Sequence, residues 1–335
     1  MLRIAIALVP VVVFLIVVWL MDAFRLVARA SLARSIGFGA VAAGLSLWLN
    51  AWLQHTFAIE SATLQRYVAP VVEETAKAII VVGLISTAAV GFLVDAALQG
   101  FAIGAGFALV ENVWYLRAIP DGSIALWAVR GCGTALLQGA LTAIVAIVAK
   151  TLAERWTTRP MLGVLPGLAA ATAVHSLFNH RFLPPLAETL VLLVALPLLV
   201  LVVFERSERA TREWIGAGLD LDIALIDLLN SPVFALTRFG TYLQELRTRL
   251  PGPVVADMFC LLRLELELSA QAKGLLLARE AGLELPADDD LEAALAERHA
   301  LEASIGKAGL LALGPLRVTS HRDKWHRQLL TGRRR

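Results

Sequence analysis

The chain has 335 residues, of which 58% are hydrophobic and only 17% charged, and its mean hydropathy is +0.71. A soluble globular protein is about a quarter charged, so this composition excludes a single soluble domain and a disordered chain. The net charge of +2 indicates no nucleic-acid surface, and Cys132 and Cys260 alone cannot form a disulfide framework.

The charged residues are distributed unevenly. Residues 1–204 contain 12 basic and 9 acidic side chains, whereas the shorter segment 205–335 contains 18 and 19. The first segment therefore has fewer charged residues than a soluble domain, and the second has the charge content of a soluble domain. We expect a transmembrane domain over residues 1–204, followed by a soluble α-helical tail over residues 205–335.

Long apolar runs in the first segment predict transmembrane helices, because a helix satisfies all its own backbone hydrogen bonds in hydrocarbon. About seven spans are expected, at residues 4–21, 36–56, 68–89, 93–116, 125–149, 161–179 and 186–204. The predicted fold is therefore an all-α polytopic membrane helix bundle in contact with the lipid bilayer. The third, fourth and sixth spans contain polar residues.

Arginine and lysine gather in alternate loops of this bundle. The loops after the first, fifth and seventh spans contain Arg25, Arg29 and Arg34, then Lys150, Arg155 and Arg159, then Arg206, Arg209 and Arg212. The other loops contain Arg66, Arg117 and Arg181, one each. Because cytoplasmic loops are rich in Arg and Lys, this pattern predicts an N-terminus outside and a cytoplasmic tail.

The tail is expected to form several amphipathic helices. Pro251-Gly252-Pro253 predicts a break, and the Leu-rich stretch 254–282 has helical periodicity. No catalytic motif occurs in this segment, and no pattern in it identifies a partner.

Charged side chains interrupt the third span. A charge near the bilayer centre costs at least about 2.5–3.5 kcal/mol, so such residues pair, line a cavity or do chemistry. Glu73 and Lys77 are four residues apart and are expected to pair on one helix face. Glu74 lies about 100° round the helix and is left as a spare carboxylate. It could be a metal ligand or a general base; a structural ion pair is the alternative.

The fourth and fifth spans carry further polar residues. The fourth begins with Asp95 and ends with Glu111-Asn112, after several glycines that allow close helix packing. The fifth contains Arg130 and Gln138, and the amide of Gln138 is able to hydrogen-bond across helices.

The sixth span ends in His175-Ser176-Leu177-Phe178-Asn179. His175 and Asn179 are one turn apart, so both are able to point at one ion. Together with the glutamates of the third and fourth spans they form a set of carboxylate and imidazole groups, which suits Zn²⁺. A spare carboxylate beside such an ion deprotonates its bound water. We therefore predict Glu111 and His175 as metal ligands.

This set resembles the PrsW family of intramembrane metalloproteases, which is related to the CAAX prenyl endopeptidases. Three motifs carry the resemblance in order over residues 65–182: E-E-x-x-K/R at Glu73, Glu74 and Lys77, G-F-x-x-x-E-N at Gly106, Phe107, Glu111 and Asn112, and H-x-x-x-D/N at His175 and Asn179. One position departs from the family, since Gln138 stands where a histidine is usual.

The resemblance implies a zinc-dependent endopeptidase of a bacterial cytoplasmic membrane that cleaves membrane-anchored proteins, with an anti-sigma factor as the substrate in one branch of the family. Glu73 or Glu74 would be the catalytic base. Lys77, Asn112, Gln138 and Asn179 would support the site.

Two other hypotheses remain open. Because glutamine is a poor zinc ligand, Gln138 raises the alternative of a catalytically silent membrane scaffold or partner-binding protein. Intramembrane acidic and imidazole groups also form proton relays, so an ion-coupled transporter is a third reading. No internal repeat supports alternating access.

Overall fold

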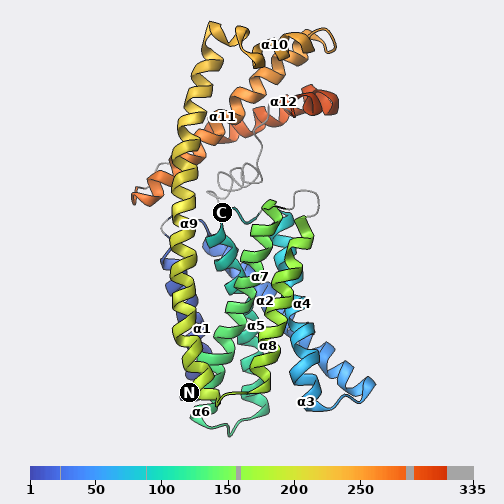
Figure 1. Ribbon diagram of the computed structural model, residues 1–335, viewed down its shortest axis with the longest axis vertical. Helices are drawn as coiled ribbons and strands as arrows, with labels where there is room; N and C mark the ends of the chain where they lie inside the picture. Colours follow the sequence, from blue (N-terminus) through green and yellow to red (C-terminus); the bar gives the residue numbers. More distant parts are fainter. Residues whose placement is uncertain (23, 88, 156–159, 284–289, 315–335) are drawn as a thin grey trace. The chain divides into compact units, whose positions relative to one another are not determined.

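The computed structural model describes all residues except 23, 88, 156–159, 284–289 and 315–335, and the described residues form helices without β-strands. The all-α prediction is therefore confirmed. The chain divides into two compact units, Met1–Glu208 and Arg209–Arg335, whose helices are shown in Figure 1.

The first unit is built from long apolar helices. Its elements are α1 (Leu2–Leu20), α2 (Arg29–Phe57), α3 (Ser61–Thr63), η1 (Leu64–Val68), α4 (Ala69–Ser86), α5 (Leu93–Ala118), α6 (Ile124–Ala128), η2 (Val129–Thr134), α7 (Ala135–Arg155), η3 (Pro160–Gly163), α8 (Val164–His180) and the start of α9 (Pro185–Asn230). Among the described residues, six helices are long and apolar enough to cross a membrane. The third expected span is also helical, as α4, but its three charged residues keep it outside that set.

Helix α5 lies at the centre of the first unit, in contact with α1, α2, α4 and α7. In its most apolar stretch 78% of residues are buried, compared with 11% for α9. Two glycines allow the close approach. A β-carbon at Gly104 would overlap the backbone carbonyl of Gln138 on α7, and one at Gly106 would overlap that of Ile36 on α2. Small residues at such contacts let backbones pack closely within a bilayer.

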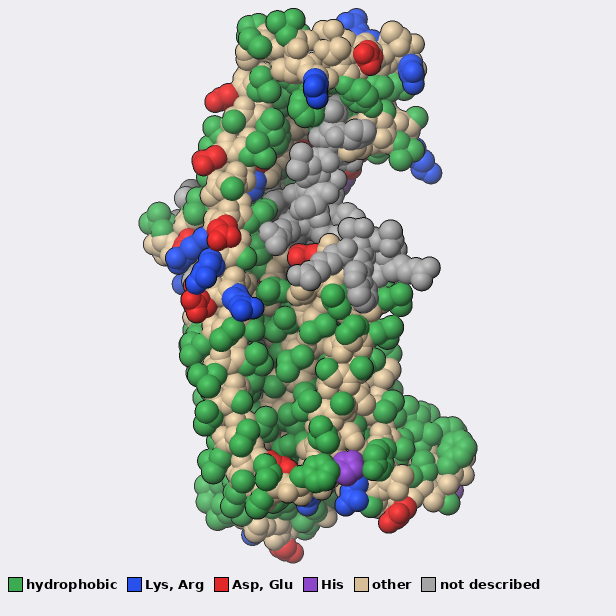
Figure 2. Space-filling model, in the orientation of Figure 1, with side chains coloured by type: hydrophobic (Ala, Val, Ile, Leu, Met, Phe, Trp, Pro, Cys, Tyr) green, Lys and Arg blue, Asp and Glu red, His purple; other side chains and the backbone are tan. Residues whose placement is uncertain are grey.

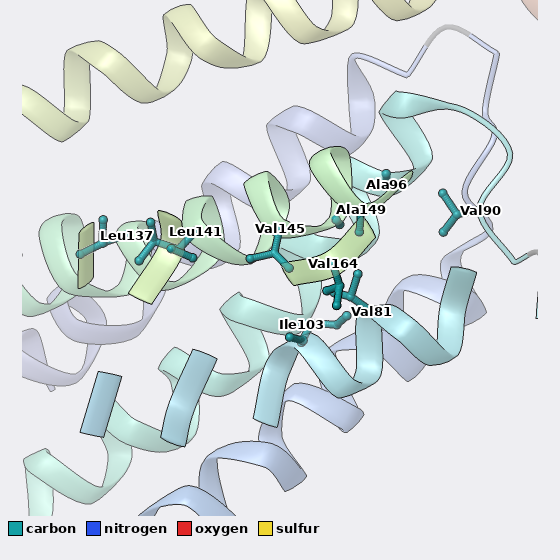
Figure 3. Close-up of a cluster of buried hydrophobic side chains, with 12 residues drawn as sticks. Val81, Val90, Ala96, Ile103, Leu137, Leu141, Val145, Ala149 and Val164 are labelled. Carbon is teal, nitrogen blue, oxygen red and sulfur yellow. The ribbon is translucent and has the colours of Figure 1, made fainter. Parts of the chain in front are cut away.

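An apolar cluster holds α4, α5, α7 and α8 together. Figure 3 shows Leu137, Leu141, Val145 and Ala149 in a row along α7, where their spacing of four residues keeps them on one face. Residues of the neighbouring helices cover this row: Val81, Ile103 and Val164. In lipid, such contacts stabilise by close packing rather than by removal of apolar surface from water.

The outer surface of the first unit is apolar. Figure 2 shows mostly hydrophobic side chains on its visible face. On α2, the side chains of Val41, Leu45 and Trp48 are exposed. On the first half of α9, Leu190, Val194 and Leu198 are exposed. Exposed apolar residues in this number are what a lipid-facing surface requires.

The second unit comprises the later part of α9 together with η4 (Pro232–Leu236), α10 (Arg238–Leu246), α11 (Gly252–Glu280) and α12 (Asp290–Leu313). Its core is a cluster of large apolar side chains that includes Leu246, Met258, Leu261 and Ile305. Helix α11 occupies the Leu-rich stretch where helical periodicity was expected. Helix α9 runs without a break past residue 204, the expected end of the last span, to Asn230.

Candidate active site

The polar residues that interrupt the apolar helices gather near one end of the first unit. Asn112 lies six residues before the end of α5, and His175 lies five before the end of α8. At 1.5 Å per residue, both are about 8–9 Å from their helix ends. The amide of Asn112 donates to the carbonyl of Ala7 at 2.8 Å, which places the start of α1 at this same end. The cluster consists of Asn50 (α2), Glu73, Glu74 and Lys77 (α4), Glu111 and Asn112 (α5), Arg130 (η2), Gln138 (α7) and His175 (α8).

Glu74 is the buried centre of the cluster. Its side chain is 0% exposed, and its Oε1 accepts hydrogen bonds at 2.7 Å from both Lys77 Nζ and His175 Nδ1. Because an ionised carboxylate only accepts, the proton of the His175 ring lies on Nδ1. Glu74 therefore fixes the orientation of the imidazole and leaves its Nε2 free to act as an acceptor.

The expected pairing of Lys77 with Glu73 was wrong, because the ammonium pairs with Glu74, three residues before it. Other helices decide this choice. Lys77 Nζ also donates to Gln138 Oε1 on α7, and it lies 4.9 Å from the centre of the Phe107 ring on α5. These contacts draw the ammonium to the face of α4 that carries Glu74. The spare carboxylate of the pair is consequently Glu73.

Glu73 and His175 face each other across the site. Glu73 Oε2 is 3.9 Å from His175 Nε2, which is too far for a direct hydrogen bond. The same oxygen accepts from Gln138 Nε2 at 3.1 Å, and Glu73 Oε1 lies 3.5 Å from Asn50 Nδ2. The Glu73 side chain is 13% exposed, in contrast to that of Glu74. Glu73 is therefore the more exposed carboxylate of the pair.

Glu111 forms an ion pair that the sequence did not reveal. Its Oε1 accepts from Arg130 Nη2 at 2.9 Å, and the same guanidinium donates to Asn112 and stacks 3.5 Å from the centre of the Tyr115 ring. Its Oε2 accepts from Gln138 Nε2 at 3.3 Å. The signal that could have identified Arg130 is its isolation as a positive charge in an apolar span, where a buried acidic partner is needed.

Asn179 lies outside the cluster. Its Nδ2 donates to the backbone carbonyl of Gln65 in η1 at 2.8 Å. His180 contacts the hydroxyl of Tyr67, also in η1, at 3.0 Å. These bonds attach the end of α8 to η1. Asn179 therefore positions a helix end and does not join the cluster around His175.

A sequence model of the PrsW family intramembrane metalloprotease matches residues 28–204, more than half of the chain. The chain belongs to the PrsW family. Comparisons with curated proteins and with solved structures found no match. PrsW membership and the apolar helices together make the chain an integral multi-pass membrane protein of a protease family, for which membrane-anchored substrates are implied.

A PrsW metalloprotease implies a metal ion, and the contacts of the cluster test whether its residues fit one. Ligand atoms on a tetrahedral Zn²⁺ with bonds of 2.0–2.2 Å are about 3.4 Å apart. The 3.9 Å between Glu73 Oε2 and His175 Nε2 exceeds this. Both oxygens of Glu111 accept hydrogen bonds, one from Arg130 and one from Gln138.

Within the described ranges, no group of three or more His, Cys, Asp or Glu side chains is placed to hold a metal ion. The amide N–H₂ of Gln138 instead lies between the carboxylates of Glu73 and Glu111. Arg130 pairs with Glu111, and Lys77 pairs with Glu74. In this arrangement the PrsW residues do not fit a metal. Zinc at this site stays a prediction from the sequence.

Proposed function

We propose that the chain is an intramembrane endopeptidase that hydrolyses peptide bonds of membrane-anchored proteins close to one surface of the bilayer. The observation that carries the proposal is the orientation of the His175 imidazole. Buried Glu74 accepts a hydrogen bond from Nδ1, and Nε2 faces the more exposed carboxylate of Glu73. A carboxylate and an imidazole acceptor directed at one point form a site for activating water. Membership of a protease family supports the same reading.

In the proposed reaction, one water molecule lies between Glu73 Oε2 and His175 Nε2. Their separation of 3.9 Å allows a water to donate one hydrogen to each. Glu73 removes a proton as the water oxygen attacks the carbonyl carbon of the scissile peptide. The C–N bond then breaks, and Glu73 returns the proton to the leaving amine nitrogen. Lys77 keeps Glu74 ionised by Coulomb attraction, so that the imidazole stays oriented.

The substrate class follows from the position of the site. His175 lies about one and a half turns before the end of α8, so a bond near the end of a substrate's membrane span is the one within reach. We place the protein in a bacterial cytoplasmic membrane, as the family resemblance implies, with its tail in the cytoplasm, as the distribution of Arg and Lys predicts. An anti-sigma factor is the substrate that the family resemblance favours. The partner of the tail stays open.

A second candidate function rests on Gln138. Its amide donates hydrogen bonds to Glu73 and Glu111 and accepts one from Lys77. The two carboxylates therefore have hydrogen-bond partners within the chain and need no metal ion for this purpose. A cluster stabilised in this way suits a catalytically silent membrane scaffold that binds partner proteins. Such a scaffold would retain its partner when Glu73 is neutralised.

The test is cleavage of single-span substrates by the purified chain in liposomes. We expect cleavage by the wild type and a loss of at least a hundredfold with Glu73→Gln or His175→Ala. His180→Ala is the matched control, because His180 lies on the same helix but contacts Tyr67, and it should keep most of the activity. Cleavage that survives both Glu73→Gln and His175→Ala refutes the proposal. Retained substrate capture without cleavage by the wild type favours the scaffold.

A further inference from the structure

Helix α2 carries two polar side chains beside the active site, and each has one oxygen atom without a hydrogen-bond partner. The side chains of Ser46 and Asn50 are 2% and 8% exposed. Four buried side-chain atoms in the described part of the chain lack a hydrogen-bond partner: Ser46 Oγ, Asn50 Oδ1, Glu74 Oε2 and Asp95 Oδ1. Two of the four thus come from one face of α2, and a third belongs to the site itself.

Asn50 reaches the catalytic helix α4, and Ser46 lies one turn away on the same buried face of α2. Asn50 Nδ2 lies 3.5 Å from Glu73 Oε1. Ser46 is one turn before Asn50 on the same face, and one turn before Ser46 the side chains of Ala42 and Ala43 pack against Ala76 of α4. Ser46 therefore lies between this apolar contact and Glu73.

Ser46 Oγ and Asn50 Oδ1 have no hydrogen-bond partner in the structure. A serine in a membrane helix commonly bonds to the carbonyl four residues earlier, but Ser46 Oγ has no partner. An unsatisfied polar group is costly in hydrocarbon. Groups left in this state call for a specific explanation, and a ligand that completes the bonding is one.

The main chain of an unwound peptide segment carries N–H and C=O groups of the kind that Asn50 Oδ1 and Ser46 Oγ lack as partners. A substrate helix must open before its peptide bond is cut, and its freed N–H and C=O groups then need partners within the membrane. In an extended chain, groups that point the same way recur about every 6.6 Å. Residues one turn apart on a helix are about 6 Å apart, so Ser46 and Asn50 match that repeat.

Given the proposed proteolytic function, we propose that Ser46 and Asn50 bind the main chain of the unwound substrate segment next to Glu73. Asn50 Oδ1 accepts a substrate N–H, and the Ser46 hydroxyl donates to a substrate carbonyl. Because Asn50 contacts Glu73 of α4, the segment enters between α2 and α4.

The test measures binding without turnover, in the full chain carrying Glu73→Gln. The probes are two fluorescent single-span peptides of Leu and Ala in nanodiscs, identical except that one has a central Gly-Pro pair that opens its helix. We expect Asn50→Leu and Ser46→Ala each to weaken binding of the Gly-Pro peptide about tenfold. Binding of the uninterrupted peptide should not change. Ser35→Ala is the control, since Ser35 lies on the same helix but already donates to Gln99 at 2.7 Å.

Thermal stability provides an independent readout. Ser46→Ala removes only an unsatisfied buried polar atom, so it should leave the resting chain equally stable or more stable. The inference therefore predicts weaker binding by Ser46→Ala without loss of stability. Unchanged binding of the Gly-Pro peptide in both variants overturns it, as does an equal loss for both peptides or a fall in the stability of Ser46→Ala. If binding behaves as expected but the wild type cleaves no substrate, the proposed function fails and the binding role of α2 stands.

Discussion

Glu73 and Glu74 are adjacent in sequence, yet the structure predicts different effects on stability when each is neutralised. In Glu74→Gln, the buried ammonium of Lys77 loses its only carboxylate contact among the described residues, and His175 loses a charge-assisted hydrogen bond. Breaking a buried ion pair typically costs about 3–5 kcal/mol. In Glu73→Gln, the partly exposed side chain loses only weak contacts, which we expect to cost about 1 kcal/mol or less.

Activity and stability should therefore separate. Glu73→Gln should fold with almost unchanged stability and lose cleavage by about a hundredfold or more, because it removes the base. Glu74→Gln should lose both. The assay is the free energy of unfolding in SDS mixed micelles, followed by circular dichroism, together with cleavage per folded chain in liposomes.

A second substitution checks the origin of the lost stability. Lys77→Met in the Glu74→Gln background removes the uncompensated charge, so it should recover at least part of the loss. Equal destabilisation by Glu73→Gln and Glu74→Gln would refute the assignment of the buried pair. Failure of Lys77→Met to restore any stability would refute its electrostatic origin.

Three further substitutions test other parts of the site. Gln138→His replaces an amide that lies between two carboxylates by an imidazole, so zinc per chain measured by plasma mass spectrometry should rise, whereas Gln138→Asn should leave it unchanged; equal zinc contents would reject the role assigned to this position. Arg130→Met leaves Glu111 without its cation and should destabilise the chain by about 2 kcal/mol or more, and adding Glu111→Gln should restore stability, as measured by unfolding in mixed micelles. Gly104→Val should reduce the folded fraction in gel filtration much more than Gly44→Val, because only Gly104 touches a neighbouring backbone.

The helices could be predicted from the sequence because apolar runs of about 20 residues have few alternatives in hydrocarbon. The third span was also found, as α4, although its charges weaken its hydropathy. The length of α9 could not be predicted in the same way. Hydropathy falls after residue 204, but the following residues retain helix-compatible side chains, so the helix continues to Asn230.

The polar residues of the site could be recognised because charges in an apolar span are costly. Which of these residues pair with one another could not be predicted from the sequence. Spacings of three and four residues both bring Lys77 near a glutamate, and the choice is made by Gln138 and Phe107 on other helices. The partners of Arg130 and Asn179 also come from distant segments, which no local pattern encodes.

The central claim is that a water held between Glu73 and His175 cuts a peptide bond of a membrane-anchored protein. The most direct measurement is cleavage of a single-span substrate by the purified chain in liposomes prepared in H₂¹⁸O, with mass spectrometry of both fragments. The account predicts one ¹⁸O atom in the new carboxyl terminus with the wild type and at least a hundredfold less labelled product with Glu73→Gln. Unlabelled fragments, or label at the wild-type rate with Glu73→Gln, would contradict it.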